Sequence, residues 1–133
     1  MRQMEPRTSY GRASDHYRSM DISSRVASAD PHTLVSILYD ELLTCIDVLA
    51  AAASRGQPLA TNNHAHRARS ILISLQSGLD FDGGGETAMM LASVYAAASD
   101  ELNARIADGN IDRISELRSA IELVALAWND ITG

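Results

Sequence analysis

The stretch that decides the fold is IDRISELRSAIELVALAWNDI, residues Ile111–Ile131. Its large apolar residues recur at alternating intervals of three and four. They are Ile114, Leu117, Ile121, Val124, Trp128 and Ile131. This period gathers them on one side of an α-helix, whereas a strand would need an interval of two. The stretch therefore predicts a helix over about residues 111–131 that buries one apolar face against other helices.

Three more segments show helical spacing, at about residues 31–55, 60–80 and 86–107. The first begins with Asp30, a suitable N-cap, and Pro31, whose missing N–H costs nothing at the first helical position. No segment shows the alternation of a strand. Four helices of similar length with short connections predict an all-α fold, an antiparallel up-and-down four-helix bundle spanning residues 29–133.

Residues 1–28 differ in composition from the rest of the chain. They are rich in Ser, Arg, Gly and Asp, and no apolar stripe is longer than a turn or two. This pattern predicts a flexible N-terminal arm. Tyr10, Tyr17, Met20 and Val26 are its apolar exceptions.

The segment LDFDGGGETA, residues 79–88, raises the possibility of a phosphate or metal site. A Walker-type phosphate loop requires a lysine, and all 11 basic residues of this chain are arginines. Asp80 and Asp82 resemble the start of a calcium loop, but the remaining ligands of such a loop do not follow. The glycines therefore predict a turn between the second and third helices.

Other residues with possible chemistry do not form a recognisable site. His64 and His66 are two positions apart and point to different sides of a helix, so they cannot share an ion. Cys45 lies on an apolar stripe, which favours a buried, inert thiol over a nucleophile. Adjacent acids such as Asp40 and Glu41 diverge by about 100°. We predict no catalytic, cofactor-binding or metal-binding residues.

The charge of the chain argues against nucleic acid as a partner. The formal net charge is −6, and from residue 31 onward six arginines face thirteen acids, a difference of −7. Such a surface repels phosphates and anionic lipid. The single cysteine, the lack of a signal-like start and the lack of an apolar run near 20 residues predict a cytoplasmic protein that does not insert into membranes.

The helices contain more apolar residues than their main seams require. The segment 31–55 has a second stripe of Tyr39, Leu43, Ile46 and Ala50, so this helix either sits centrally or faces a partner. Six further residues lie off the main seams: Ile71, Met90, Val94, Ala97, Leu123 and Ala127. We expect an exposed apolar groove, of the kind that binds helices. Core filling is the favoured interpretation of Met89 and Met90, and a partner surface the alternative.

Several short motifs, in order, resemble the flagellar export chaperone family FliS. The family pattern "TASP..L...LY.." is similar to Ser28–Pro31 followed by Leu34, Leu38 and Tyr39. The pattern "LQ.SLD...GGE.A..L..LY" is similar to the sequence from Leu75 to Tyr95, and the late "AW" to Ala127 and Trp128. The chain departs from the family after Tyr95, where three alanines replace the usual aromatic residue and methionine.

The resemblance implies a helical bundle that binds the disordered C-terminal segment of flagellin and prevents premature polymerisation. It also implies delivery to the export gate protein FlhA, and an arm that can cover part of the client groove. Together with the surplus apolar residues, it gives seven predicted client-binding residues. They are Tyr10 and Tyr17 in the arm, and Leu43, Ile46, Met90, Val94 and Ala97 lining the groove.

Two other hypotheses compete with an export chaperone. A regulatory or structural bundle could self-associate weakly through the same apolar surface. An enzyme would need a convergent polar cluster that the sequence does not contain.

Overall fold

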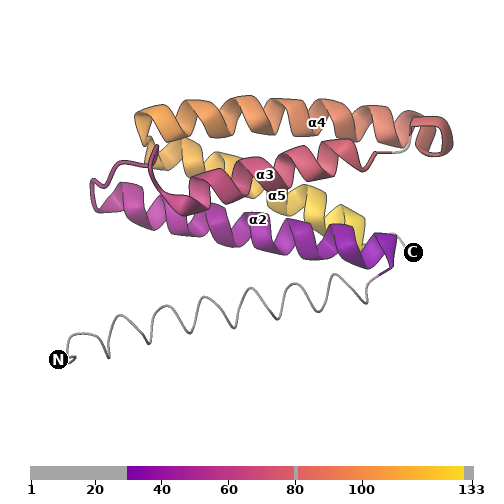
Figure 1. Ribbon diagram of the computed structural model, residues 1–133, viewed down its shortest axis with the longest axis horizontal. Helices are drawn as coiled ribbons and strands as arrows, with labels where there is room; N and C mark the ends of the chain where they lie inside the picture. The colour runs from indigo at the N-terminus through magenta and orange to yellow at the C-terminus, as the bar shows by residue number, and fades with distance from the viewer. Residues whose placement is uncertain (1–29, 80, 131–133) are drawn as a thin grey trace. The chain divides into compact units, whose positions relative to one another are not determined.

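The computed structural model describes residues 30–79 and 81–130. Within these residues it contains four α-helices and no strand, which confirms the predicted all-α class. They are α2 (Pro31–Ser54), α3 (Asn63–Ser77), α4 (Phe81–Asp108) and α5 (Ile111–Asp130), labelled in Figure 1. The predicted arm, residues 1–28, and its boundary with the bundle lie outside the described residues.

The helix ends follow local capping chemistry. A side-chain oxygen of Asp30 accepts a hydrogen bond of 2.8 Å from the backbone N–H of Thr33, and this bond lowers the pKa of Asp30. The second helix begins three residues later than predicted because Asn62 caps it, accepting from the N–H of His64 at 2.8 Å. It also ends earlier, at Ser77, because Gly78 follows as its C-cap.

The glycine-rich segment differs from the predicted turn. Helical structure resumes at Phe81 instead of Glu86, so the glycines fall inside the bounds of α4. Gly85 nevertheless interrupts the helix with φ 54° and ψ −130°, a conformation that essentially only glycine adopts without strain. The backbone therefore does change direction in this segment, but at a single glycine inside α4.

The contacts divide the chain into two units, residues 1–37 and 38–133. In the second unit the core comes mostly from the predicted seams, including Leu42, Leu72, Leu102 and Ile121. The seam of α5 departs slightly from its prediction, because Ala125 is buried where Val124 is half-buried. Cys45 is 0% exposed, as its apolar surroundings in the sequence predicted.

Helix α2 is buried on both of its apolar stripes. Leu42 and Leu49 on one stripe are buried, and so are Tyr39 and Ile46 on the other. Of the two possibilities raised by the sequence, a second stripe left open for a partner is not supported at Tyr39 and Ile46, which residues of α4 and α5 cover. Tyr39 and Ile46 therefore belong to the core, whereas Leu43 and Ala50 of the same stripe are half-buried.

Polar and aromatic contacts join α2 to α3 and to α5. Glu41 pairs with Arg67 of α3 at 3.0 Å, and Asp47 pairs with Arg118 of α5 at 2.7 Å. The Tyr39 ring packs edge-on against Trp128 of α5, with ring centroids 6.3 Å apart. From Tyr39 to Asp47 the residue numbers rise along α2, while those of their partners fall from Trp128 to Arg118 along α5. These two contacts are therefore those of an antiparallel pair. The antiparallel order of the complete bundle stays a prediction.

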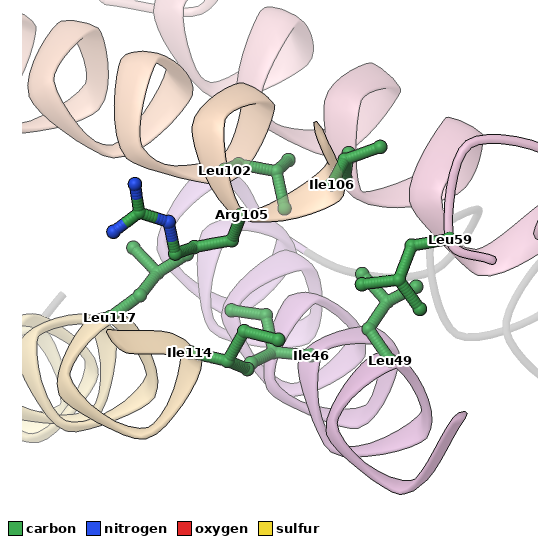
Figure 2. A pocket seen from close by; sticks show the side chains of 8 residues that line it. All are labelled: Ile46, Leu49, Leu59, Leu102, Arg105, Ile106, Ile114 and Leu117. Atoms are coloured by element: carbon green, nitrogen blue, oxygen red, sulfur yellow. The ribbon is translucent and has the colours of Figure 1, made fainter. Parts of the chain in front are cut away.

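A cavity of about 10 Å³ lies inside the second unit (Figure 2). Seven of its eight lining residues are aliphatic: Ile46, Leu49, Leu59, Leu102, Ile106, Ile114 and Leu117. The eighth, Arg105, contributes its carbon stem, while its guanidinium group points away from Leu49 and Leu59. This volume is no larger than one water molecule requires, and the apolar walls give water few partners. The cavity is a small packing defect and offers no room for a ligand.

Candidate functional site: the α4–α5 groove

A groove of about 350 Å³ runs between α4 and α5, which contact each other, and it is lined by residues 94–101 of α4 and 113–121 of α5. We call it the α4–α5 groove. Its lining residues are Val94, Ala97, Ala98 and Glu101 of α4, and Arg113, Glu116, Leu117, Ala120 and Ile121 of α5. The groove is by far larger than the internal cavity and is open to the surface.

The middle of the groove is apolar and has low walls. Leu117 and Ile121 are buried and form its base, whereas Ala97 and Ala120 are exposed on either side of it. Alanine side chains project only one carbon, so another helix could approach both walls closely. The groove thus has the size and chemistry to accept the apolar face of a helix.

Helical spacing continues this apolar surface beyond the groove itself. Met90 precedes Val94 by one turn and is 62% exposed, and Leu123 follows Ala120 by three residues and is 68% exposed. Ala127, one turn after Leu123, is also exposed. Exposed large apolar residues on the surface of a bundle are typical of a binding surface when they cluster.

Charged residues gather at the end of the groove nearest the connection between α4 and α5. Arg113 places one nitrogen 3.3 and 3.2 Å from the two carboxylate oxygens of Glu101, and another 3.4 Å from Glu116. Arg105 also donates to Glu101, at 3.3 Å, and pairs with Asp108 at 3.3 Å. Of these ion pairs, the one between Arg113 and Glu101 joins the end of α4 to the start of α5.

The structure separates the seven predicted client-binding residues into three groups. Val94 and Ala97 line the α4–α5 groove, and Met90 lies on the same side of α4 by spacing. Leu43, which is half-buried, and Ile46, which is 2% exposed, are not among the residues that line this groove. Tyr10 and Tyr17 lie outside the described residues. The client-binding role of all seven stays a prediction.

One expectation from the sequence was wrong, and one feature of the site was not predicted. Met89 and Met90 are 64% and 62% exposed, so core filling was the wrong expectation for both. The charged end of the groove was not identified, although spacing held a signal: Glu101 continues the side of α4 that carries Val94 and Ala97. The sequence could not show that Arg113 and Glu116 of α5 line the groove together with Glu101.

The described residues contain neither a metal-binding cluster nor a membrane-spanning helix. Residues 30–79 and 81–130 contain no group of three or more His, Cys, Asp or Glu side chains that could hold a metal ion. None of the helices in the same ranges is long and apolar enough to cross a membrane. The groove therefore stands out through its shape and its apolar surface.

Comparison with known proteins identifies the family. Residues 13–133 match the model of a family described as flagellar protein FliS. The chain belongs to the FliS family. This finding confirms the resemblance seen in the short motifs, and it extends the likeness over most of the sequence.

Curated relatives carry the same description over nearly their whole length. The chain is 27% identical over 121 residues to the flagellar secretion chaperone FliS of Salmonella typhimurium, covering 87% of each chain. It is 24% identical over 123 residues to that of Vibrio cholerae, covering 87% of this chain and 90% of the relative. With the protein of Campylobacter jejuni it shares 28% identity over 102 residues. Membership of this family supports a role in flagellar export.

Proposed function

We propose that this FliS-family chain binds the C-terminal segment of flagellin in the cytoplasm, prevents its premature polymerisation and delivers it to the export gate protein FlhA. The observation that carries the proposal is the apolar α4–α5 groove, which lies on the surface of a member of a secretion chaperone family. Flagellin would be the client, and no cofactor or catalytic step is needed.

Binding would work by burial of apolar surface on both partners. A client helix with apolar residues at intervals of three and four could lay them between Ala97 and Ala120, above Leu117 and Ile121. If the client segment is disordered before binding, part of the interaction energy orders it. The net affinity is then lower than the contact area suggests, which suits a partner that must be released.

The N-terminal residues enter the proposal through Tyr10 and Tyr17. Both are aromatic groups in an otherwise polar stretch, and we expect them to contribute to the client surface. Delivery to FlhA predicts that the complex of chaperone and client binds the gate more tightly than the chaperone alone does. Pull-down of purified FlhA cytoplasmic domain, with and without the flagellin fragment, measures this difference.

The direct test is calorimetric titration of the full chain with the C-terminal fragment of flagellin from the same organism, accompanied by circular dichroism. We expect saturable one-to-one binding and more helix than the separate partners contain. Ala97 and Ala96 provide a matched pair, because both are exposed on α4 but only Ala97 lines the groove. Ala97→Arg should weaken binding at least about tenfold by obstructing the groove, and Ala96→Arg should leave it nearly unchanged.

The proposal fails if the fragment gives neither heat nor added helix while another binder recognises it. If Ala97→Arg and Ala96→Arg lose affinity equally, the assignment of the client to the α4–α5 groove is wrong. Circular dichroism of each variant alone shows whether it is folded.

Self-association is the second candidate function, because an exposed apolar groove can also bind a second copy of the chain. Sedimentation equilibrium over a hundredfold range of concentration distinguishes the two. A mass that rises with concentration, and falls back for Ala97→Arg, favours self-association. A constant monomer mass favours the chaperone.

A further inference from the structure

The α4–α5 groove is chemically different at its two ends, and this difference bears on how a client lies in it. All three charged lining residues, Glu101, Arg113 and Glu116, are near the connection between α4 and α5. Toward the other end, the lining residues Val94 and Ile121 are apolar, and Met90 and Leu123 continue the surface. A helix bound in one direction would therefore meet different chemistry from a helix bound in the other.

The ion pairs at the charged end leave one carboxylate largely available. Glu101 accepts hydrogen bonds from both Arg105 and Arg113, so its oxygens already have cationic partners. The side chain of Glu116 is 72% exposed, and its ion pair is a single contact of 3.4 Å with Arg113. Arg113 is shared, because the same guanidinium group also binds Glu101 at 3.2 Å.

The charges within these ion pairs do not balance, and Asp112 in the first turn of α5 adds a further negative charge to those counted next. Glu101, Asp108 and Glu116 supply three negative charges, whereas Arg105 and Arg113 supply two positive charges, which leaves −1. An incoming anion would meet this excess, and Arg113 already has two carboxylate partners. An incoming cation could pair with Glu116 without breaking the bonds of Glu101.

We propose that Glu116 pairs with a basic side chain of the client and so favours one direction and register of the client helix in the α4–α5 groove. The partner is thus an amphipathic helix whose apolar ridge lies between Ala97 and Ala120 and which carries a lysine or arginine at the end nearest the α4–α5 connection. This inference rests on the proposed function and specifies the client chemistry. Glu116 is a specificity residue, and the apolar contacts supply most of the affinity.

The test uses the full chain and the C-terminal flagellin fragment, titrated calorimetrically in low salt. Glu116→Gln removes the charge and keeps the shape of the side chain, and we expect it to weaken binding about threefold, the size typical of one exposed ion pair. Glu122→Gln is the matched control on α5, because Glu122 pairs instead with Arg118, at 3.2 Å, and is not part of the groove. It should change affinity less than about 1.5-fold.

The direction of the client helix is tested with a variant at the apolar end of the groove and with substitutions in the client fragment. Glu86 is exposed on α4 one turn before Met90, so Glu86→Gln removes a carboxylate at the apolar end and should have no more effect than Glu122→Gln. In the fragment, each lysine and arginine is replaced singly by glutamine. At one position the loss should vanish when the chaperone carries Glu116→Gln, as a double-mutant cycle requires for interacting partners.

A charge exchange completes the design. Glu116→Arg should weaken binding more than Glu116→Gln does, and changing the identified client residue to glutamate should restore at least half of that loss, on a logarithmic scale. Circular dichroism and sedimentation show that each variant is folded.

The possible outcomes separate the inference from the function beneath it. If the fragment binds but Glu116→Gln and Glu86→Gln act alike, or no client position couples to Glu116, the inference is wrong and the proposed function stands. If the fragment does not bind the unchanged chain, both are overturned.

Discussion

The paired hydroxyl groups of Tyr39 and Tyr95 allow a quantitative test of the core. The two rings are 1% and 2% exposed, their centroids lie 6.4 Å apart, and the hydroxyls form a hydrogen bond with each other between α2 and α4. Tyr39→Phe removes one hydroxyl and leaves that of Tyr95 buried without this partner. Because an unsatisfied buried hydroxyl costs about 1–3 kcal/mol, we expect a loss of about 2 kcal/mol in the free energy of unfolding.

The double variant distinguishes this mechanism from a general packing effect. Tyr95→Phe should cost a similar amount by the same reasoning, but Tyr39→Phe with Tyr95→Phe removes both polar groups and leaves neither unsatisfied. Apolar groups of nearly the same shape then fill the site, and the edge-on packing of the ring against Trp128 can remain. The single losses sum to about 4 kcal/mol, whereas the double variant should lose only the net hydrogen bond of about 1 kcal/mol, so it should be less destabilised than the sum by about 3 kcal/mol.

Urea unfolding followed by circular dichroism measures these changes. With a slope of about 2 kcal/mol per M, a loss of 2 kcal/mol lowers the midpoint by about 1 M, which is readily resolved. The reasoning is refuted if the losses of the single variants add in the double variant. Additivity would mean that each hydroxyl is satisfied independently of the other.

Three further predictions follow from the same residues and from two others. Burial raises the pKa of both tyrosines above 10, and the hydrogen bond between the two hydroxyls adds to the increase in the pKa of Tyr39. Their folded-state pKa values exceed the unfolded values, so their contribution to stability is complete below about pH 10 and declines as the pH rises above it. The Tm should fall above pH 10, and less steeply in the double phenylalanine variant. Gly85→Ala should destabilise by about 1–3 kcal/mol in urea unfolding because of the φ of 54°, whereas Gly78→Ala, at φ −85°, should cost less than about 1 kcal/mol. Cys45, 0% exposed, should react with an aromatic disulfide reagent at least about a hundredfold more slowly in buffer than in denaturant; equal rates would contradict its burial.

The helices could be predicted from sequence because their signals are local. Intervals of three and four identify a helix without knowledge of its neighbours, and Asp30 marks a helix start through a bond to the N–H of Thr33. The first turn of α3 was misplaced because Asn62, the actual cap, was preceded by residues that also suit a helix. At the glycine segment, a single residue with positive φ was sufficient to interrupt the helix, where a longer turn was predicted.

The location of the exposed apolar surface could not be predicted because it depends on which helices meet. The sequence shows two apolar stripes on α2, but only contacts such as those of Tyr39 with Tyr95 and Trp128 show that the second stripe is covered. The same lack of information about neighbouring helices explains why Met89 and Met90 were expected in the core. Nothing local distinguishes an apolar residue that faces a neighbouring helix from one, such as Met90, that faces solvent.

The burial of Ile46 favours a groove on α4 and α5 over a site on α2. At 2% exposed, Ile46 lies against the internal cavity with residues from α4 and α5, including Leu102 and Ile114. A client could reach Ile46 only after these contacts separate. Large-to-small substitutions in protein cores lower the free energy of unfolding by about 2–5 kcal/mol each, so exposing several core residues at once would be costly. Ala97 and Ala120 need no such opening, since they are already exposed beside the groove. Ile46→Val should accordingly lower stability by about 1 kcal/mol, as measured by urea unfolding, and leave the affinity of the folded chain for the flagellin fragment unchanged. The opposite result would be a folded Ile46→Val variant that binds the fragment more weakly, together with an Ala97→Arg variant whose affinity is unchanged. It would show that the client enters between α2 and its neighbours.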